Sequence, residues 1–361
     1  MLFPIMDIKE LTKTDLEAWM RERGEKPYHA RQVLKWLYQR GATSFAAMTD
    51  VSTVLRARLE QEFSIAKLGC VRMTSAADGT RKFLFALHDG RYIESVQIPA
   101  EDRLTLCVSS QVGCAMGCRF CATATVRPIR DLTAGEIVSQ IWDVQQTLPV
   151  AQRLTNLVFM GMGEPLANYD QLVKAIEIIT AEWGCNFSPR RVTVSTVGLV
   201  PQMKRLLEET SVNLTVSLTA TTNTLRDDLM PVNRRFPLEQ LLETCRTLPI
   251  APRKRVTFAY TMLKDVNDSE ADAKRLTKLL QGFRLKVNLI PFNPFPGSEF
   301  QASPRPRIEY FRQALLDKGI MATIRESRGQ DAQAACGQLA AAFPVGIPAN
   351  PDERREERTT A

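Results

Sequence analysis

The sequence predicts an α/β fold, namely a partial (β/α)6 barrel with a small helical N-terminal domain. Two observations support it. From residue 104 onward, short strand-like runs alternate with longer segments of helical periodicity, which is typical of repeated βα units around a parallel sheet. Residues 1–65, in contrast, show only helical patterns. The alternation alone does not exclude an open doubly wound sheet, which is the main alternative architecture.

The N-terminal segment contains two helical patterns. Residues 11–16 offer capping residues before an amphipathic run, and residues 28–40 place apolar side chains at helical spacing. Arg31, Lys35 and Arg40 give this segment basic faces, which fit a solvated surface as well as an RNA contact. We treat residues 1–65 as an accessory domain that contacts RNA.

A β-hairpin region is expected at residues 66–100, as a linker to the barrel. Two strand-like runs, residues 80–87 and 92–98, flank the turn signal Asp89-Gly90.

The barrel itself is expected over residues 101–345. Its strands are predicted at residues 104–109, 154–160, 191–196, 212–218, 255–261 and 285–290, with a weaker seventh at 322–325. Helices are expected to begin near Thr133, Tyr169, Val200, Pro237, Ser269 and Arg305. Residues 348–361 lack apolar side chains able to pack, so we expect residues 346–361 to form a disordered tail.

The amino-acid composition limits the classes of protein to which this chain can belong. A chain of 361 residues that is 44% hydrophobic can bury a large core, and its eight cysteines are too few for a disulfide scaffold. No secretory signal is evident and no window approaches 18 uncharged apolar residues, so we expect a cytoplasmic protein that enters no membrane. The formal charge of +7 fits a nucleic-acid partner without proving one.

Three cysteines form the most informative motif. Cys114, Cys118 and Cys121 are spaced C-x3-C-x2-C, and thiolates are the soft ligands that iron–sulfur clusters require. A structural zinc site or a ferredoxin would close its coordination with a fourth Cys or His, and none stands in this loop. The spacing therefore indicates a 4Fe–4S cluster with one iron open to a small chelating substrate.

Other candidate site residues follow the predicted strands, where the loops of a βα barrel converge. They are Gly163 and Glu164 after the second strand, Ser195 at the third, Ser217-Leu218-Thr219 at the fourth, and Asn293 beyond the sixth. Without the cysteine motif, each would be interpreted as part of a turn or as a polar residue that closes a strand. Two further cysteines, Cys107 in the first strand and Cys336 in a polar loop, are either buried small hydrophobes or nucleophilic thiols.

These motifs resemble known enzymes. The three-cysteine spacing, with Phe120 before the last ligand, resembles the radical S-adenosylmethionine (SAM) signature, in which the open iron chelates SAM. Across nearly the whole chain the sequence resembles the RlmN family, which methylates carbon 2 of adenosine in 23S ribosomal RNA and certain tRNAs. The matching motifs are LCVSSQVGC (residues 106–114), GMGEP (161–165), NLIPFNPFPG (288–297) and ACGQL (335–339).

The resemblance implies a role for each site residue. Cys114, Cys118 and Cys121 would ligate the cluster, and SAM would be bound by Gly163, Glu164, Ser195, Ser217, Leu218, Thr219 and Asn293. Cys336 would carry a methyl group, Cys107 would be the resolving thiol and Glu94 would handle a proton. From the sequence alone, Glu94 is more simply interpreted as an exposed strand residue.

The implied reaction uses two SAM molecules, because an aromatic adenine carbon is too poor a nucleophile to attack a methyl group directly. One SAM methylates Cys336, and the second yields a radical that removes hydrogen from this methyl before it adds to adenine. Attack by Cys107 then releases the product and leaves a Cys107–Cys336 disulfide. The implied partners are 23S rRNA and tRNA, with an electron donor such as flavodoxin, and the chain is expected to be a monomer.

Two departures from the family pattern leave alternatives open. Thr219 stands where the family usually has His, and the loop after the cysteines contains Pro128 and lacks glycine, so its shape is expected to differ. A paralogue with another RNA target, a Cfr-like enzyme that attacks carbon 8, and a non-catalytic RNA-binding protein are the competing hypotheses.

Overall fold

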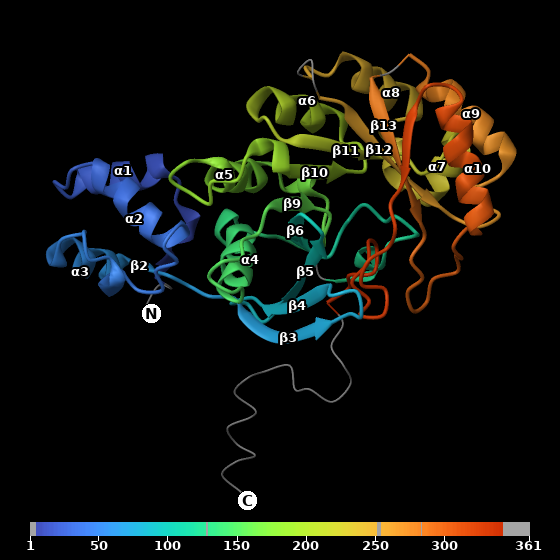
Figure 1. Ribbon diagram of the computed structural model, residues 1–361. Coiled ribbons are helices and arrows are strands. Elements are labelled where there is room, and N and C mark those ends of the chain that lie inside the picture. The colour runs from blue at the N-terminus through green and yellow to red at the C-terminus, as the bar shows by residue number, and fades with distance from the viewer. Residues whose placement is uncertain (1–4, 128, 251–253, 283, 342–361) are drawn as a thin grey trace, which may run out of the picture.

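The computed structural model describes residues 5–127, 129–250, 254–282 and 284–341 (Figure 1). The tail predicted at residues 346–361 lies outside the described residues, and so does Pro128. Within the described ranges, no helix is long and apolar enough to cross a membrane.

A ten-stranded sheet forms the centre of the molecule. Seven of its strands are parallel and follow one another in chain order: β6 (Arg103–Cys107), β9 (Asn156–Phe159), β10 (Val192–Thr196), β11 (Asn213–Ser217), β12 (Val256–Met262), β13 (Leu285–Pro291) and β14 (Met321–Ile324). A doubly wound sheet would need a reversal of strand order, whereas successive right-handed crossovers in sequential order put every helix on one face. The sheet therefore curls into a partial barrel, as predicted, and the alternative architecture is excluded.

The hairpin region is part of this sheet. β4 (Arg81–Ala86) and β5 (Tyr92–Ala100) form the expected hairpin, and β3 (Gly69–Ser75) adds a strand that we did not predict. The expectation of a separate linker needs correction, because β5 pairs antiparallel with β6 and so continues the barrel sheet. β3 escaped prediction because its side chains are mostly exposed and show no apolar alternation.

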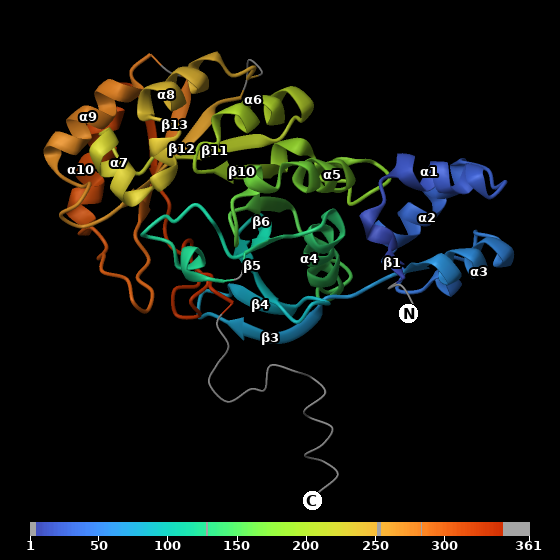
Figure 2. The ribbon, with the colours of Figure 1, turned by 180° about the vertical axis from the view of Figure 1, so that it is seen from behind.

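Helices cover the outer face of the sheet (Figure 2). They are α4 (Ala134–Gln146), α5 (Tyr169–Thr180), α6 (Val200–Glu209), α8 (Leu238–Thr247), α9 (Glu270–Leu280) and α10 (Arg305–Leu316), each beginning where the sequence predicts, and a short α7 (Asn223–Leu229) that we did not predict. Thr133 and Ser269 cap α4 and α9 with capping boxes. Short elements complete this part: β7 (Gln111–Val112), β8 (Arg130–Asp131), η3 (Ala122–Thr125), η4 (Pro165–Asn168), η5 (Pro189–Arg191) and η6 (Pro231–Arg234).

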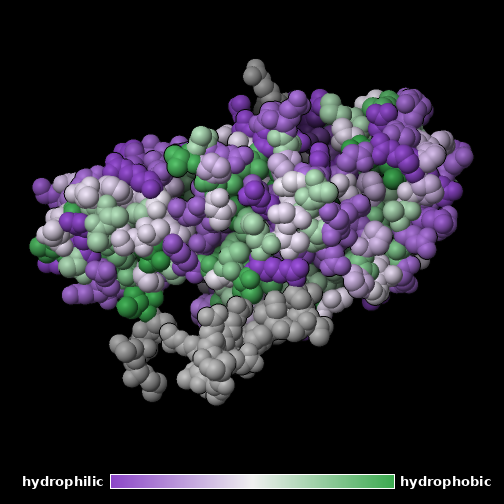
Figure 3. All heavy atoms as spheres, turned by 60° about the horizontal axis from the view of Figure 1, so that its bottom comes forward, coloured by the Kyte–Doolittle hydropathy of each residue, from purple (hydrophilic) through white to green (hydrophobic). Residues whose placement is uncertain are grey.

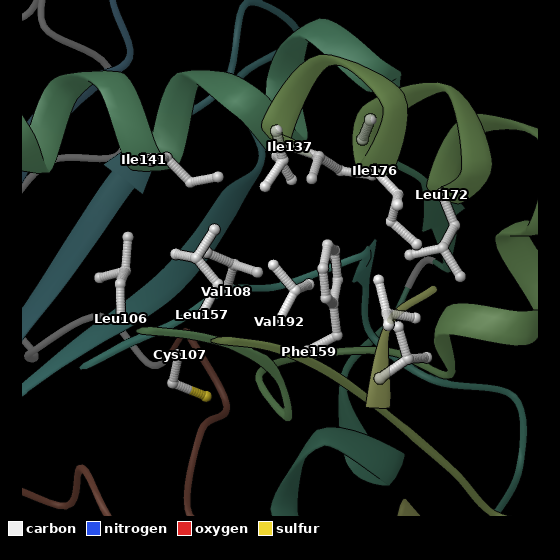
Figure 4. Packing of buried hydrophobic residues seen from close by; sticks show 14 of the residues in the cluster. Leu106, Cys107, Val108, Ile137, Ile141, Leu157, Phe159, Leu172, Ile176 and Val192 are labelled. Atoms are coloured by element: carbon white, nitrogen blue, oxygen red, sulfur yellow. The ribbon is translucent and has the colours of Figure 1, made fainter. Parts of the chain in front are cut away.

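The hydrophobic core lies between the sheet and these helices. Figure 4 shows Leu106 of β6 and Val108, directly after β6, facing Ile137 and Ile141 of α4, whereas Cys107 points to the opposite side of the sheet. This follows from the two-residue period of a strand, which sends alternate side chains to opposite faces. The outward positions are apolar, so the inner face is left free for polar and reactive groups.

The N-terminal segment forms a small helical unit beside α4. It contains β1 (Met6–Asp7), η1 (Ile8–Glu10), α1 (Lys13–Glu22), α2 (Tyr28–Tyr38), η2 (Phe45–Ala47), α3 (Thr53–Glu62) and β2 (Phe63–Ser64). The Trp142 indole N–H donates to the Leu37 carbonyl at 2.9 Å, and the fully buried Lys9 ammonium lies 5.3 Å from the Trp142 ring. On the face shown in Figure 3, hydrophobic residues occur in small groups among hydrophilic ones.

Candidate active site

The inner face of the partial barrel is built in layers. Every second residue of a strand points inward, so each parallel strand contributes side chains at three successive positions from its amino to its carboxyl end. We call these positions levels; because the strands are staggered, residues of one level are not all register partners. The level at the amino ends contains Arg103, Asn156, Arg191, Asn213, Arg255 and Lys286. The middle level contains Thr105, Val158, Thr193, Thr215, Thr257 and Asn288. Towards the carboxyl ends come Cys107, Met160, Ser195, Ser217, Ala259 and Ile290.

The cysteine loop follows the first barrel strand at its carboxyl end. Gly113 has φ of 72°, and a Cβ there would lie 2.7 Å from the Val126 carbonyl oxygen, so only glycine fits. Cys121 precedes η3, and its N–H donates to the Cys118 carbonyl at 3.2 Å. The loop therefore returns on itself and brings Cys114, Cys118 and Cys121 to one cavity of about 160 Å³.

Glycines after β9 allow a second loop to approach the first. A Cβ on Gly161 would lie 2.7 Å from the Ser109 hydroxyl oxygen, and one on Gly163, where φ is 103°, would lie 2.6 Å from the Gln111 side chain. The Met162 and Glu164 amides donate to the Ser109 hydroxyl and the Gln111 amide oxygen, each at 2.8 Å. The GMGEP segment is thereby fixed beside the cysteines.

Glu164 is buried at the wall of this cavity. Its two carboxylate oxygens accept the N–H groups of Leu166 at 3.1 Å and Val197 at 2.9 Å. Burial raises the pKa of Glu164 to about 7, while these backbone donors oppose the shift. Each oxygen keeps a lone pair, so the carboxylate can still accept from an ammonium group of a ligand.

Cys336 lies at the junction of two cavities. It lines the cavity of the three cysteines and also a second cavity, of about 1080 Å³, which contains Cys107. Asn293 donates to the Cys336 carbonyl at 3.0 Å, and the Ala122 N–H donates to the Gly337 carbonyl at 2.7 Å. The segment carrying Cys336 is thus bonded directly to the cysteine loop.

Cys107 is buried on the inner face of the first barrel strand. Burial and, to a smaller extent, the neighbouring Cys336 raise the pKa of its thiol to about 12, while Arg325 opposes the shift. The electrostatic coupling of the two thiols, together with their shared cavity, places Cys107 and Cys336 together although they are far apart in the sequence.

Glu94 lies on β5 and lines neither cavity. It is 3% exposed, so its interpretation as an exposed strand residue is wrong. One oxygen pairs with Lys82 at 3.0 Å, and the other accepts the N–H groups of Ala340 and Ala341, both at 3.0 Å. The carboxylate therefore binds the end of the segment that carries Cys336.

The seven expected SAM contacts divide into two groups. Gly163, Glu164, Ser195, Ser217 and Asn293 line the cavity of the three cysteines. Leu218 and Thr219 are buried behind it: the Leu218 N–H donates to the Ala259 carbonyl, and Thr219 has φ of 55°. The structure does not bring these two side chains to the cavity lining.

Two arginines escaped the sequence interpretation. Arg325 lines both cavities at the end of β14, where only the weak seventh strand pointed to it. Arg226 is fully buried and donates to the Val197 and Ser217 carbonyls at 2.7 and 3.0 Å. It joins the carboxyl ends of β10 and β11, and no motif marks it in the sequence.

The three thiols fit an iron–sulfur cluster by their chemistry and position. Within the described residues, no group of three or more His, Cys, Asp or Glu side chains converges on one position for a single metal ion. A cubane cluster does not require such convergence, because each thiolate binds a different iron. Burial raises the pKa of Cys114 to about 12, a cost that binding to iron removes because a ligating thiol is deprotonated.

Family models match two parts of the chain. Residues 6–65 match the ribosomal RNA large subunit methyltransferase N-terminal domain, and residues 108–276 match the radical SAM superfamily.

Similar proteins cover almost the whole chain. The dual-specificity RNA methyltransferase RlmN of Geobacter sulfurreducens is 51% identical over 335 residues, which cover 93% of this chain and 92% of the relative. The RlmN of Syntrophotalea carbinolica is 49% identical over 98% of this chain and 94% of its own length. The crystal structure of a radical SAM methyltransferase from Sphaerobacter thermophilus is 44% identical, with a TM-score of 0.88 over 93% of this chain and 100% of that one.

Proposed function

Because this chain belongs to the RlmN family of dual-specificity RNA methyltransferases, within the radical SAM superfamily, we propose that it methylates carbon 2 of adenosine in RNA. The substrates are 23S rRNA and tRNA. The observation that carries the proposal is the position of Cys336, which lines both the cavity of the three cysteines and the cavity of Cys107. One sulfur can therefore meet SAM on one side and RNA on the other.

Each cavity residue has a defined task in this proposal. Cys114, Cys118 and Cys121 hold a 4Fe–4S cluster, which, when bound, supplies the electron for reductive cleavage of SAM. Gly163 lets the backbone approach SAM closely, and Glu164 accepts from its ammonium group. Ser195, Ser217 and Asn293 offer hydrogen-bonding groups from three other strand ends.

The two cysteine thiols have different roles in the methyl transfer. The Cys336 sulfur would take a methyl group from one SAM, with release of S-adenosylhomocysteine and the thiol proton. It would then hold this methyl where one hydrogen can be removed from it before its carbon bonds to the adenine ring. Cys107 then attacks the Cys336 sulfur, which frees the product and leaves a disulfide for reduction. Disulfide formation requires the two thiols to lie close together, and Cys107 and Cys336 line the same cavity. Glu94 is the proposed proton acceptor, with the restriction that its oxygens bind Lys82 and the Cys336 segment in this structure.

The remaining parts of the proposal concern partners and location. We propose a monomer in the cytoplasm that receives electrons from a carrier such as flavodoxin, since thiols and an iron–sulfur cluster require a reducing compartment. Methylation at carbon 8 and a non-catalytic role are not favoured, because the sequence is similar to RlmN relatives over nearly its whole length.

The proposal is tested by product analysis. After anaerobic reconstitution, the protein is incubated with SAM, a reductant and total RNA, and the digested nucleosides are analysed by mass spectrometry. We expect 2-methyladenosine; 8-methyladenosine, or no methylated adenosine despite SAM cleavage, would contradict the proposal.

Variants assign the cysteines within the same assay. Cys336→Ala should abolish methylation, and Cys107→Ala should accumulate a covalent protein–RNA species. Cys118→Ala should lose the 4Fe–4S absorption. Cys70→Ala is the matched control, because Cys70 is exposed on β3 and lines neither cavity.

A further inference from the structure

The cavity that contains Cys107 is strongly basic. Among the described residues its lining includes eight Arg or Lys and a single Glu, a formal charge of +7, and one of these cations, Arg328, lies 3.9 Å from Asp78. The whole chain also carries a formal charge of +7, so the charges of all its other residues sum to about zero. Such a concentration attracts a polyanion far more strongly than the same charge spread over the surface.

The cations occupy a specific level of the barrel. Arg103, Arg191, Arg255 and Lys286 stand at or next to the amino ends of β6, β10, β12 and β13. The cysteine loop follows the carboxyl ends, so these cations and the three cysteines lie at opposite ends of the inner face. We call these four residues the cation ring.

The cation ring is not neutralised by the protein. Among the described residues, none of its four members forms an ion pair; Arg191 instead donates to the Asn156 amide oxygen at 3.1 Å. Glu326, the only carboxylate in the part of the lining that the structure describes, is paired with Arg305 at 2.5 Å. In contrast, Arg31 and Arg40 of the N-terminal unit are paired with Glu182 and Asp50.

The distance from the cation ring to the thiols suits one nucleotide. From Arg103 to Cys107 the strand rises about 13 Å. This is comparable with the reach from a phosphate to the far edge of its base once the flexible arginine side chains are included. The intervening level is largely hydroxyl groups, from Thr105, Thr193 and Thr257, which can accept and donate hydrogen bonds to a ribose or base.

We propose that the RNA strand enters from the amino-terminal end of the barrel and that the cation ring binds the phosphates flanking the flipped adenosine. This rests on the proposed function and adds a substrate-binding surface opposite the SAM side. The base passes the threonine level and reaches Cys336 and Cys107 at the inner end of the cavity. SAM and RNA thus approach Cys336 from different sides, and neither blocks the other.

The test measures RNA binding without turnover. The probe is an RNA hairpin with an unpaired loop adenosine, and the protein is the reconstituted full chain. Arg191→Gln/Arg255→Gln should weaken binding at least about fivefold and lower the salt dependence of log Kd by about 1 to 2, because each lost phosphate contact removes about 0.7–0.9 from the slope. Binding that keeps both its affinity and its salt slope would overturn the proposal.

The control and a double-mutant cycle sharpen this test. Arg312→Gln/Lys318→Gln removes the same charge from α10 and the turn after it, outside both cavities, and should leave binding unchanged. Neutral methylphosphonates at the two flanking phosphates should weaken binding to the wild-type protein but have little further effect on the ring variant. Full additivity of the two losses would show that the cation ring binds elsewhere on the RNA.

Failure of this inference is distinguishable from failure of the proposed function. Methylation of Cys336 by SAM requires no RNA and should proceed equally in wild type and ring variant. Suppose that wild type produces 2-methyladenosine, and that Lys35→Gln on α2 weakens RNA binding whereas the ring variant does not. The proposed reaction would then be correct, and the proposed site of RNA entry would be wrong.

Discussion

Lys82 and Glu94 form an ion pair on adjacent strands, with 3.0 Å between Nζ and Oε1, directly against the segment that carries Cys336. Lys82 also donates to the Gln333 carbonyl at 3.1 Å, and the second oxygen of Glu94 accepts the Ala340 and Ala341 N–H groups. This pair therefore anchors both ends of the Cys336 segment to the hairpin. While the segment is anchored, the Glu94 carboxylate has no oxygen without a donor.

Removal of Lys82 should loosen the Cys336 segment. Lys82→Met leaves a buried carboxylate with only two backbone donors, and we expect a loss of about 2 kcal/mol in the free energy of unfolding. Hydrogen exchange should become faster for the amides of residues 333–341. Lys318→Met, on the exposed turn after α10, is the control, and unchanged exchange in the Lys82 variant would contradict the anchoring role.

Glu94→Gln separates anchoring from proton transfer. The amide oxygen can still accept the Ala340 and Ala341 N–H groups, and Lys82 can still donate to the Gln333 carbonyl, so both ends of the segment keep a hydrogen bond although the ion pair is lost. Exchange of this segment should therefore be slower than in the Lys82 variant. Methylation should nevertheless fall by at least about 100-fold if Glu94 accepts the ring proton. Equal activity of the variant and wild type would show that Glu94 only positions the segment.

Arg226 should be irreplaceable by lysine. Its guanidinium reaches the Val197, Ser217 and Leu218 carbonyls and the Asn233 amide oxygen at once, and burial lowers its pKa to about 10. In Arg226→Lys a single ammonium group replaces the guanidinium and leaves some of these carbonyls without a donor. We expect the free energy of unfolding to fall by about 3 kcal/mol. SAM binding should weaken too, since Ser217 lines the cavity that we propose to bind SAM. Isothermal titration with SAM and thermal unfolding measure the two effects.

Thr219 should be a strained position. Its φ of 55° is unfavourable for a β-branched residue, and its buried hydroxyl has no hydrogen-bond partner among the described residues. Thr219→Gly should therefore raise the free energy of unfolding by about 1 kcal/mol. Chemical denaturation measures this change. Thr210→Gly, directly after α6, is the control: φ of Thr210 is −134°, which any residue adopts, so this substitution should lower the free energy of unfolding.

The barrel could be predicted because its apolar runs carry strong local signals. The strand expected at residues 285–290 is observed at Leu285–Pro291, and the capping box of Thr133 begins α4 where expected. α7 was missed since its seven residues are too few and too polar to show a helical period. The cysteine motif located the candidate site for the same reason, as its signal is contained in eight consecutive residues.

The rest of the site depends on contacts that only the folded chain creates. Glu94 meets Lys82 through strand register and meets Ala340 through the return of the chain after β14. Arg103, Arg191 and Arg255 each stand at a strand start, where a single charge is ordinary, and only sheet register places them around one cavity. Sequence spacing contains no information about either arrangement.

Asp143 should make stability depend on pH. Burial in α4 raises the pKa of Asp143 to about 6, against the Leu68 N–H and two lysines that lower it. Since the folded state binds the proton more tightly than the unfolded state, the free energy of unfolding falls as pH rises from about 4 to 6. In Asp143→Asn, the decrease in the free energy of unfolding over this pH range should be smaller by about 1–2 kcal/mol. This figure allows for the partial exposure of the Asp143 side chain to solvent. Urea unfolding at pH 4.5 and 7.5 tests it, and an equal difference in both proteins would refute the assignment.

Cys107 should resist alkylation until high pH. Because burial raises the pKa of its thiol to about 12, little thiolate exists near neutrality, and its reaction with iodoacetamide should accelerate about tenfold for each pH unit up to that value. The exposed Cys70 should react first and serves as the internal reference in peptide mass spectrometry. Cys336→Ala should accelerate labelling of Cys107, because the neighbouring thiol, which lines the same cavity, raises the Cys107 pKa. Labelling of Cys107 as fast as Cys70 at pH 7.5 would show that this thiol is already accessible and ionised. The resolving role proposed for Cys107 would then require no change in the Cys336 segment.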